Sequence, residues 1–159
     1  MEQSERKLPP YQRSLAGTLL AAREAVMAPI RPMLRAANVT EQQWRVLRVL
    51  DHAGPTDPTS LAEAALLFAP SVARILKELV ERGLIRRAPH AHDRRRAVLT
   101  LSPSGQALVR DTSRRTVALL DDYAARFGRQ RLDDLLAELR TFTAAIDLGE
   151  GEPSPPEPS

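Results

Sequence analysis

Two short amphipathic segments joined by a tight turn constrain this chain more than any other feature. A helix is predicted over residues 61–67, because Ser60 and Glu63 have the spacing of a capping box. A second helix is predicted to start with Pro70 and to end at Gly83, the residues that favour a helix start and a helix end. Two helices separated by only a few residues form the helix-turn-helix pattern.

The hydrophobic period changes from helical to alternating after Gly83. Residues 84–88 and 96–101 are predicted to be two strands, and they flank a polar segment, 89–95. Arginines at 94–96 make this tip basic. The sequence therefore predicts a β-hairpin directly after the helix-turn-helix.

Helices are predicted elsewhere in the chain. The first spans about 11–36, with kinks at Pro29 and Pro32. The next spans about 40–53, because Thr40 and Gln43 form a capping box.

Two more helices are predicted, from Pro103 to Gly128 and from near Gln130 onward. The last one carries a continuous apolar stripe from Leu132 to Ile146, which is wider than a lone helix on a small domain needs. We therefore interpret the first and last helices as a dimer interface.

The predicted fold class is mainly α with a small β-hairpin, in one domain that spans 11–148. Within it, residues 40–102 form a winged helix-turn-helix domain, and residues 11–36 and 103–147 form the helical dimerisation region. Residues 1–10 are predicted to be a flexible N-terminus. The segment 149–159 has three Glu, four Pro and no basic residue, so a disordered acidic tail is expected.

Basic residues are concentrated in one part of the chain. The whole sequence has 23 Lys and Arg against 20 Asp and Glu, a formal charge of +3. The stretch 74–96 alone has eight basic and three acidic residues. Although most charge clusters are simply solvated, this one coincides with the predicted helix-turn-helix and hairpin, which favours a polyanionic partner.

The predicted second helix of the motif has one apolar and one polar face. On a helical wheel Arg74 and Lys77 lie opposite the apolar residues. A helix in the DNA major groove reads base edges with three or four side chains near its start, and arginine is the usual partner of guanine. Arg74 is therefore the predicted guanine contact, and the helix start at Pro70 is a possible phosphate site. An ordinary amphipathic surface helix is the alternative.

The hairpin tip is predicted to contact DNA as well. Arg94 is expected to meet phosphate, while Asp93 orients Arg95 through a charge-assisted pair. A disordered polar loop is the alternative interpretation. The complete set of predicted DNA-binding residues is Pro70, Ser71, Arg74, Lys77, Asp93, Arg94, Arg95 and Arg96.

Composition argues against several other classes of protein. The chain has no cysteine, which excludes thiolate chemistry and disulfides, and it lacks the glycine-rich and nucleophile motifs of common enzymes. His90, His92 and Asp93 could in principle bind a metal, but their spacing on a solvent-facing tip is weak evidence. No apolar run is long enough for a membrane span. A cytoplasmic protein without catalytic residues, metal or cofactor is expected.

The sequence resembles the MarR family of winged helix-turn-helix regulators over about residues 19–146. Asp93 to Arg95 is similar to the family's wing motif, and residues 101–105 (LSPSG) are similar to the segment that follows it. Segments 22–27, 40–50 and 69–76 look like those of a subgroup that represses homoprotocatechuate-degradation operons, near repressors of hydroxynicotinate degradation. Ala73 and Ser102 depart from the usual threonines, so the operator sequence cannot be transferred.

The resemblance implies a homodimeric repressor that binds a palindromic double-stranded operator and is released by a small aromatic carboxylate. The controlled genes would degrade an aromatic compound or a hydroxynicotinate. By the same resemblance the effector site involves Arg23, Trp44 and Arg48, where an arginine could pair with the carboxylate and the indole could stack on the ring. Trp44 as a core residue and Arg48 as a surface ion pair remain open, as do a regulator without an effector and a non-enzymatic dimerisation module.

Overall fold

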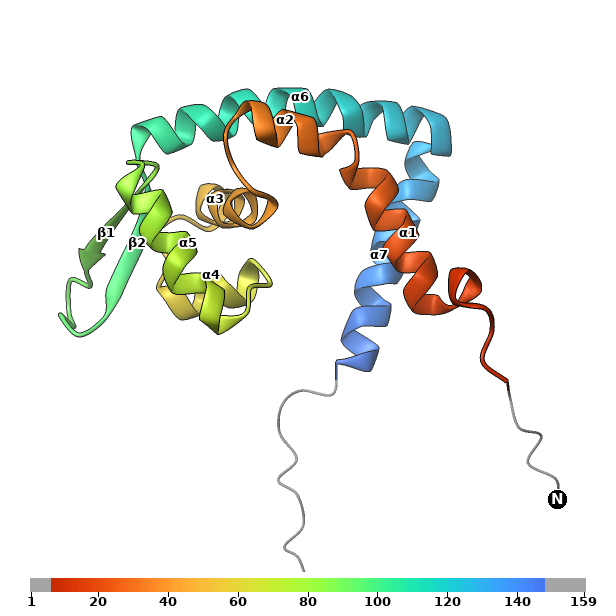
Figure 1. Ribbon diagram of the computed structural model, residues 1–159, viewed down its shortest axis with the longest axis horizontal. Coiled ribbons are helices and arrows are strands. Elements are labelled where there is room, and N and C mark those ends of the chain that lie inside the picture. The colour runs from red at the N-terminus through yellow and green to blue at the C-terminus, as the bar shows by residue number, and fades with distance from the viewer. Residues whose placement is uncertain (1–6, 148–159) are drawn as a thin grey trace, which may run out of the picture. The chain divides into compact units, whose positions relative to one another are not determined.

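The computed structural model describes residues 7–147, which fold into helices and one two-stranded antiparallel sheet (Figure 1). This confirms the predicted fold class. The described residues fall into two compact units, one up to Thr116 and one from Val117 onward. In chain order the elements are η1 (Tyr11–Arg13), α1 (Leu15–Met27), α2 (Ile30–Ala36), α3 (Glu41–Ala53), α4 (Pro58–Ala64), α5 (Ala69–Glu81), β1 (Ile85–Pro89), β2 (Ala97–Leu101), α6 (Pro103–Phe127) and α7 (Arg129–Ile146).

The terminal predictions fall largely outside the described residues. Residues 7–10 have no helix or strand, and residues 1–6 are not described. The acidic tail, 149–159, lies entirely outside the described residues. The flexible N-terminus, the disordered tail and the domain boundaries therefore stay predictions.

The core of the first unit lies among α3, α4, α5 and the hairpin. Its fully buried side chains come from each of these elements and include Leu47, Leu61, Ile75, Leu79, Ile85 and Leu99. The loop after α3 also joins the sheet, because Thr56 and Leu99 exchange two backbone hydrogen bonds of 3.0 and 2.9 Å. The helix-turn-helix and the hairpin thus share one core.

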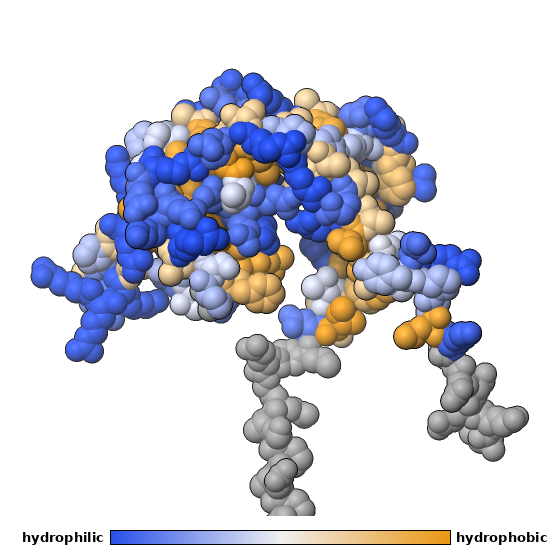
Figure 2. All heavy atoms as spheres, viewed as in Figure 1, coloured by the Kyte–Doolittle hydropathy of each residue, from blue (hydrophilic) through white to orange (hydrophobic). Residues whose placement is uncertain are grey.

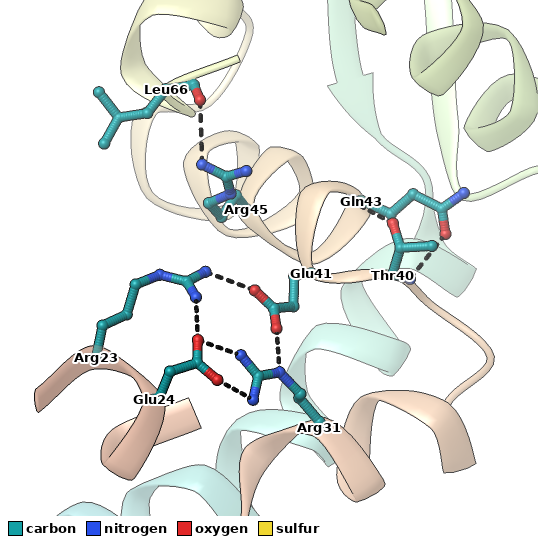
Figure 3. Close-up of polar contacts among 8 residues, drawn as sticks. All are labelled: Arg23, Glu24, Arg31, Thr40, Glu41, Gln43, Arg45 and Leu66. Atoms are coloured by element: carbon teal, nitrogen blue, oxygen red, sulfur yellow. Dashed lines mark hydrogen bonds and ion pairs between the residues drawn. The ribbon is translucent and has the colours of Figure 1, made fainter. Parts of the chain in front are cut away.

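The predicted start of α3 is confirmed atom by atom. The Thr40 hydroxyl accepts from the Gln43 amide at 3.1 Å, and the Gln43 side-chain oxygen accepts from the Thr40 amide at 3.2 Å (Figure 3). This reciprocal cap satisfies two amides that a helix start leaves without partners. It also fixes the direction in which α3 leaves the preceding loop.

The boundaries of α4 differ from the prediction. Asp57, not Ser60, caps the helix, and its carboxylate accepts from the amides of Thr59 and Ser60 at 3.1 and 3.0 Å. Pro58 then occupies the first turn, where its missing amide costs nothing. Hydrogen bonds from Ser60 are the main cause of the lowered pKa of Asp57.

The end of α4 is also earlier than predicted. The helix stops at Ala64, and Leu66 adopts a left-handed conformation with φ of 52°. Such a conformation is costly for a residue other than glycine, so it needs support from its surroundings. Arg45 of α3 supplies one contact by donating to the Leu66 carbonyl at 3.1 Å (Figure 3).

The end of α5 and the hairpin follow the predicted pattern. Gly83 has a φ of 67°, and the Leu84 amide donates to the Leu79 carbonyl at 3.0 Å, which is the glycine-terminated helix end. β1 and β2 then pair in antiparallel register, from Ile85 opposite Leu101 to Pro89 opposite Ala97.

The segment Ser102–Gly105 joins the hairpin to α6 and to the end of α5. The hydroxyls of Ser102 and Ser104 both donate to the Gly83 carbonyl, and the Ser102 hydroxyl accepts from the Gly105 amide at 3.0 Å. A Cβ at residue 105 would overlap the Leu84 carbonyl, so glycine is required there. The small residues of this segment therefore allow close backbone packing.

The N-terminal helix is divided more sharply than predicted. In place of one kinked helix over 11–36, the chain forms η1, α1 and α2, with the break after Met27. Pro29 has no amide to continue the hydrogen-bond ladder, which explains the break. Pro32 lies in the first turn of α2, where it is tolerated.

The second unit contains the end of α6 and the whole of α7, joined at Gly128 with φ of 101°. None of the α7 side chains is buried, and Leu135, Leu136 and Ile146 are exposed. On α1 of the first unit, Leu15, Leu19 and Leu20 are exposed too. Among residues 7–147, none of the helices has the length and apolar character to cross a bilayer.

Candidate nucleic-acid interface

Helix α5 presents a narrow polar face to solvent. Val72, Ile75, Leu76 and Leu79 are buried, so the opposite side of the helix is the exposed one. Arg74 and Lys77 lie there, with side chains that are 63% and 75% exposed. Pro70 is exposed and Ser71 is half-buried on the first turn. The predicted helical residues therefore share one accessible stripe.

Both basic side chains on this stripe have acidic neighbours one turn later. Arg74 pairs with Glu78 at 2.8 Å, and Lys77 approaches Glu81 at 3.7 Å. The second oxygen of Glu78 accepts from the side-chain amide of Gln43 on α3 at 2.9 Å. The stripe is thus partly neutralised in the free protein.

The start of α5 lies one residue earlier than predicted. Phe68, not Ala69, is the cap residue, and it makes no side-chain cap hydrogen bond. The Ser71 amide donates to the Phe68 carbonyl at 3.0 Å, and Pro70 has no amide to offer. Fewer backbone donors therefore face a phosphate than an ordinary helix start would provide.

The hairpin tip is a hydrogen-bonded turn. The His90 amide donates to the Arg96 carbonyl at 2.9 Å, and the Arg96 amide donates to the Asp93 carbonyl at 3.0 Å. The Asp93 carboxylate accepts from the Arg95 backbone amide at 3.0 Å. The expected pairing of Asp93 with the Arg95 guanidinium is therefore wrong: Asp93 shapes the backbone of the turn, because its short side chain reaches the nearest amide first.

The arginines at the tip are open to solvent. Arg94, Arg95 and Arg96 are exposed, and no carboxylate of residues 7–147 forms an ion pair with Arg94 or Arg95. Exposed Arg86 and Arg87 on β1 extend the basic character along the hairpin. In Figure 2 the projecting end of this hairpin, at the left of the view, is hydrophilic.

The two histidines of the tip form a local contact. Their rings are 5.9 Å apart between centroids, and Nδ1 of His90 accepts from the His92 amide at 3.2 Å. In the described part of the chain no group of three or more His, Asp or Glu side chains could hold a metal ion.

The predicted effector residues lie in different surroundings. Trp44 is only 6% exposed, whereas Arg48, one turn further along α3, is exposed. Arg23 on α1 donates to Glu41 of α3 at 2.6 Å and to Glu24 at 3.1 Å. Residues 41, 44 and 48 share a helical face, so this contact places Arg23 at the N-terminal end of the face that carries Trp44 and Arg48.

Arg31 of α2 completes a four-residue ion-pair cluster with Arg23, Glu24 and Glu41 (Figure 3). Its guanidinium contacts Glu24 at 2.8 Å and also pairs with Glu41. Hydrogen bonds from Arg31 are the main cause of the lowered pKa of both glutamates. The cluster joins α1, α2 and α3 within the first unit.

Comparisons with known proteins agree with this geometry. A model of the MarR family matches residues 37–96. The transcriptional regulator FarR of Neisseria gonorrhoeae is 37% identical over 132 residues, covering 81% of this chain and 90% of the relative. The homoprotocatechuate degradative operon repressor of Escherichia coli is 34% identical, covering 82% and 88%.

The chain belongs to the MarR family.

Two solved structures are informative about relatives. NadR in complex with 4-hydroxyphenylacetate is 36% identical, has a TM-score of 0.73, and the match covers 84% of this chain and 96% of NadR. CouR bound to a 23-mer DNA duplex is 29% identical, has a TM-score of 0.74, and the match covers 88% and 99%. This MarR-family chain is therefore a transcriptional regulator with a winged helix.

Some contacts at these sites were accessible to sequence reasoning and others were not. The pair of Arg74 and Glu78 has the i, i+4 spacing that brings helical side chains together. Arg23 and Glu41 are 18 residues apart, and Gln43 and Glu78 are 35 apart, so no local pattern predicts either contact.

Proposed function

We propose that this protein is a ligand-responsive repressor that binds a palindromic operator as a homodimer and is released by a small aromatic carboxylate. The controlled operon would degrade an aromatic compound or a hydroxynicotinate. The observation that carries the proposal is that one core holds both the exposed stripe of α5, with Arg74 and Lys77, and the arginine-rich tip of the adjacent hairpin. The protein would act by binding and not by catalysis, in the cytoplasm where its operator would be.

The proposed DNA contacts divide into base reading and phosphate binding. Arg74 lies near the start of α5 with most of its guanidinium donors free, which suits a guanine edge in the major groove. Lys77, Pro70 and Ser71 would contact the backbone beside it. Arg94, Arg95 and Arg96 would meet phosphates or the minor groove, with Asp93 holding the turn. CouR, a relative, is known bound to duplex DNA, which supports this docking.

The proposed dimer uses the apolar residues that remain exposed on α1 and α7. Leu135, Leu136 and Ile146 lie on a helix with no buried side chain. A protein rarely leaves such a stripe in water, so a second copy is its proposed cover. Light scattering should give the mass of a dimer, and a monomer at micromolar concentration would contradict the proposal.

The proposed effector site lies along the face of α3 that carries Trp44 and Arg48, with Arg23 at its end. An aromatic acid is the proposed ligand class because NadR is known in complex with 4-hydroxyphenylacetate. Arg23 is already paired with Glu41, so a ligand carboxylate would have to exchange with that glutamate.

The same contacts favour a second candidate, a DNA-binding regulator without an effector. Arg23 is neutralised by two glutamates and Trp44 is nearly inaccessible. If neither residue becomes accessible to a ligand, these contacts serve only to hold the helices together.

Thermal unfolding with 4-hydroxyphenylacetate separates the two candidates. A ligand at 100 times its dissociation constant stabilises the folded state by about 2.7 kcal/mol. The matched control is 4-hydroxyphenylethanol, which has the same ring without the carboxylate. Stabilisation by the acid but not by the alcohol, lost in Arg23→Ala and Arg48→Ala, supports the ligand-responsive repressor. Identical unfolding curves with the acid, with the alcohol and with no added compound favour the regulator without an effector.

Operator binding is tested with a duplex that the protein selects from a random library. The selected sequence should be palindromic, with half-sites about one helical turn apart. Adding the effector should weaken binding to this duplex, and the duplex should weaken effector binding by the same factor.

A further inference from the structure

Gln43 is a buried polar residue with more contacts than its role as a helix cap requires. The residue is only 5% exposed. Its side-chain oxygen accepts from the Thr40 amide at 3.2 Å and from the Arg82 guanidinium at 3.3 Å. The cap uses only that oxygen. The side-chain nitrogen donates to Glu78 of α5 at 2.9 Å, which the cap does not explain.

Glu78 is held from two sides. One carboxylate oxygen accepts from Gln43, and the other accepts from the Arg74 guanidinium at 2.8 Å. Gln43, Glu78 and Arg74 therefore form a continuous hydrogen-bonded chain from the interior of the first unit to the exposed stripe of α5. Charge-assisted bonds of this kind are the stronger class of hydrogen bond and fix the direction of the partners.

The neighbouring acid on α5 provides an internal comparison. Glu81 approaches Lys77 at 3.7 Å, and both side chains are largely exposed. No other partner of Glu81 is found among the described residues. Of these two glutamates on one helix, only Glu78 is bonded to a buried side chain, and it is also the less exposed and the more closely paired of the two.

We propose that Gln43 and Glu78 are positioning residues that set the base specificity of Arg74. This rests on the proposed function, in which Arg74 reads a base pair in the major groove. A free arginine loses rotamer freedom when it docks on a base, and an arginine already held by Glu78 loses less. The guanidinium has five N–H donors, so the bond to Glu78 leaves donors for a guanine edge.

The charge of Glu78 and its hold on Arg74 affect DNA binding in different ways. Its carboxylate repels the phosphates of every duplex, whatever the sequence, so it weakens non-specific binding. Its hold on Arg74 matters only where the correct base is present. The repulsion acts on the operator and on other DNA alike, so only the hold on Arg74 widens the difference between them, which is the quantity that defines specificity.

The experiment uses the full-length protein, a duplex selected from a random library, and all single-base-pair variants of one half-site. Affinities are measured by fluorescence anisotropy for Glu78→Ala, Glu81→Ala and Arg74→Ala. Glu78→Ala should reduce discrimination by about five- to tenfold at the base pair where Arg74→Ala also reduces it. Glu81→Ala removes the same charge from the same helix and should raise non-specific affinity with unchanged discrimination.

A double substitution shows whether Glu78 acts through Arg74. In an Arg74→Ala background, Glu78→Ala should produce no further change in discrimination. Glu78→Ala leaves the buried Gln43 amide without its acceptor and should unfold at a somewhat lower temperature than Glu81→Ala, so affinities are measured at a temperature where thermal unfolding shows both variants fully folded. Gln43→Met, which retains volume and removes the amide, should reduce discrimination at the same base pair.

Three results would overturn the inference. If Arg74→Ala affects discrimination and Glu78→Ala does not, Glu78 has no positioning role, while the proposed function stands. If Glu78→Ala and Glu81→Ala behave alike, the effect is only that of charge. If Arg74→Ala relaxes no base pair, the proposed role of Arg74 fails and the positioning role fails with it.

Discussion

Arginines at the hairpin tip and arginines in the ion-pair cluster have the same chemistry but different surroundings. Arg94 and Arg95 are exposed without a carboxylate partner among residues 7–147. Arg23 and Arg31 are each bonded to the same two glutamates, Glu24 of α1 and Glu41 of α3. The first pair is free to meet a polyanion, whereas the second pair holds helices together. Counting basic residues in a sequence therefore overestimates the charge available to DNA.

Arg74 is intermediate between these two groups. It is exposed like the tip arginines, yet it is paired with Glu78 like the cluster arginines. A single paired arginine that keeps free donors is suited to selective contacts, while unpaired arginines favour any phosphate. The predictions below test this distinction, from the largest expected effect to the smallest.

The largest effect is expected from Arg94→Ala combined with Arg95→Ala. Affinity should fall on the order of 10- to 100-fold for every duplex at low salt, and the dependence on salt should become shallower, because phosphate contacts are lost. The control is Arg23→Ala combined with Arg31→Ala, which removes the same charge. If the control weakens DNA binding equally, pairing does not decide which arginines contact DNA.

Arg74→Ala should have a more selective effect, confined to the operator. It should cost about 1–3 kcal/mol on the selected operator and relax specificity at one base pair in each half-site. Binding to scrambled DNA should change far less. Titration of both duplexes with the variant measures the difference in affinity. An equal loss of affinity for the two duplexes would contradict the division between base contacts and phosphate contacts.

Asp93→Ala should weaken DNA binding by less than the loss of the arginines themselves. The substitution removes the acceptor of the Arg95 amide, so the turn loses a local bond while all tip arginines remain. Asp93→Asn keeps an oxygen in the same place and should restore most of the affinity. An Asn variant as weak as the Ala variant would show that the charge of Asp93, and not the turn, is what matters.

The smallest effect concerns the stability of the ion-pair cluster and its dependence on pH. The folded-state pKa of Glu41 lies below its ordinary value of 4.5, so the unfolded state takes up the proton first as pH falls. The stabilisation is therefore fully present above 4.5 and is lost as pH falls through the lowered folded pKa.

Glu41→Gln should accordingly lower the unfolding temperature at neutral pH by a few degrees at most, because the side chains of the cluster remain 26–49% exposed to solvent. The difference from the parent protein should shrink as pH drops below 4.5. Thermal unfolding across pH 3 to 7 tests this, and a constant difference over the whole range would exclude a role for the charge of Glu41.

The sequence alone determined most of the local structure. Thr40 and Gln43 specify the start of α3, Gly83 specifies the end of α5, and the change from helical to alternating period specifies the hairpin. These features rest on contacts within a few residues along the chain, which local chemistry controls. The exposed stripe of Arg74 and Lys77 follows from the same helical periodicity.

Only the tertiary structure decided which charges are free. Glu41, which binds Arg23, and Glu78, which binds Gln43, lie on other helices. The cap of α4 was instead a local choice, because Asp57 binds amides only two and three residues away. Asp93 is also a local case, because its carboxylate accepts from a backbone amide two residues away and not from the guanidinium of the same residue. Residue type sets what a side chain is able to bind, but packing of distant segments sets which partner comes within hydrogen-bond distance.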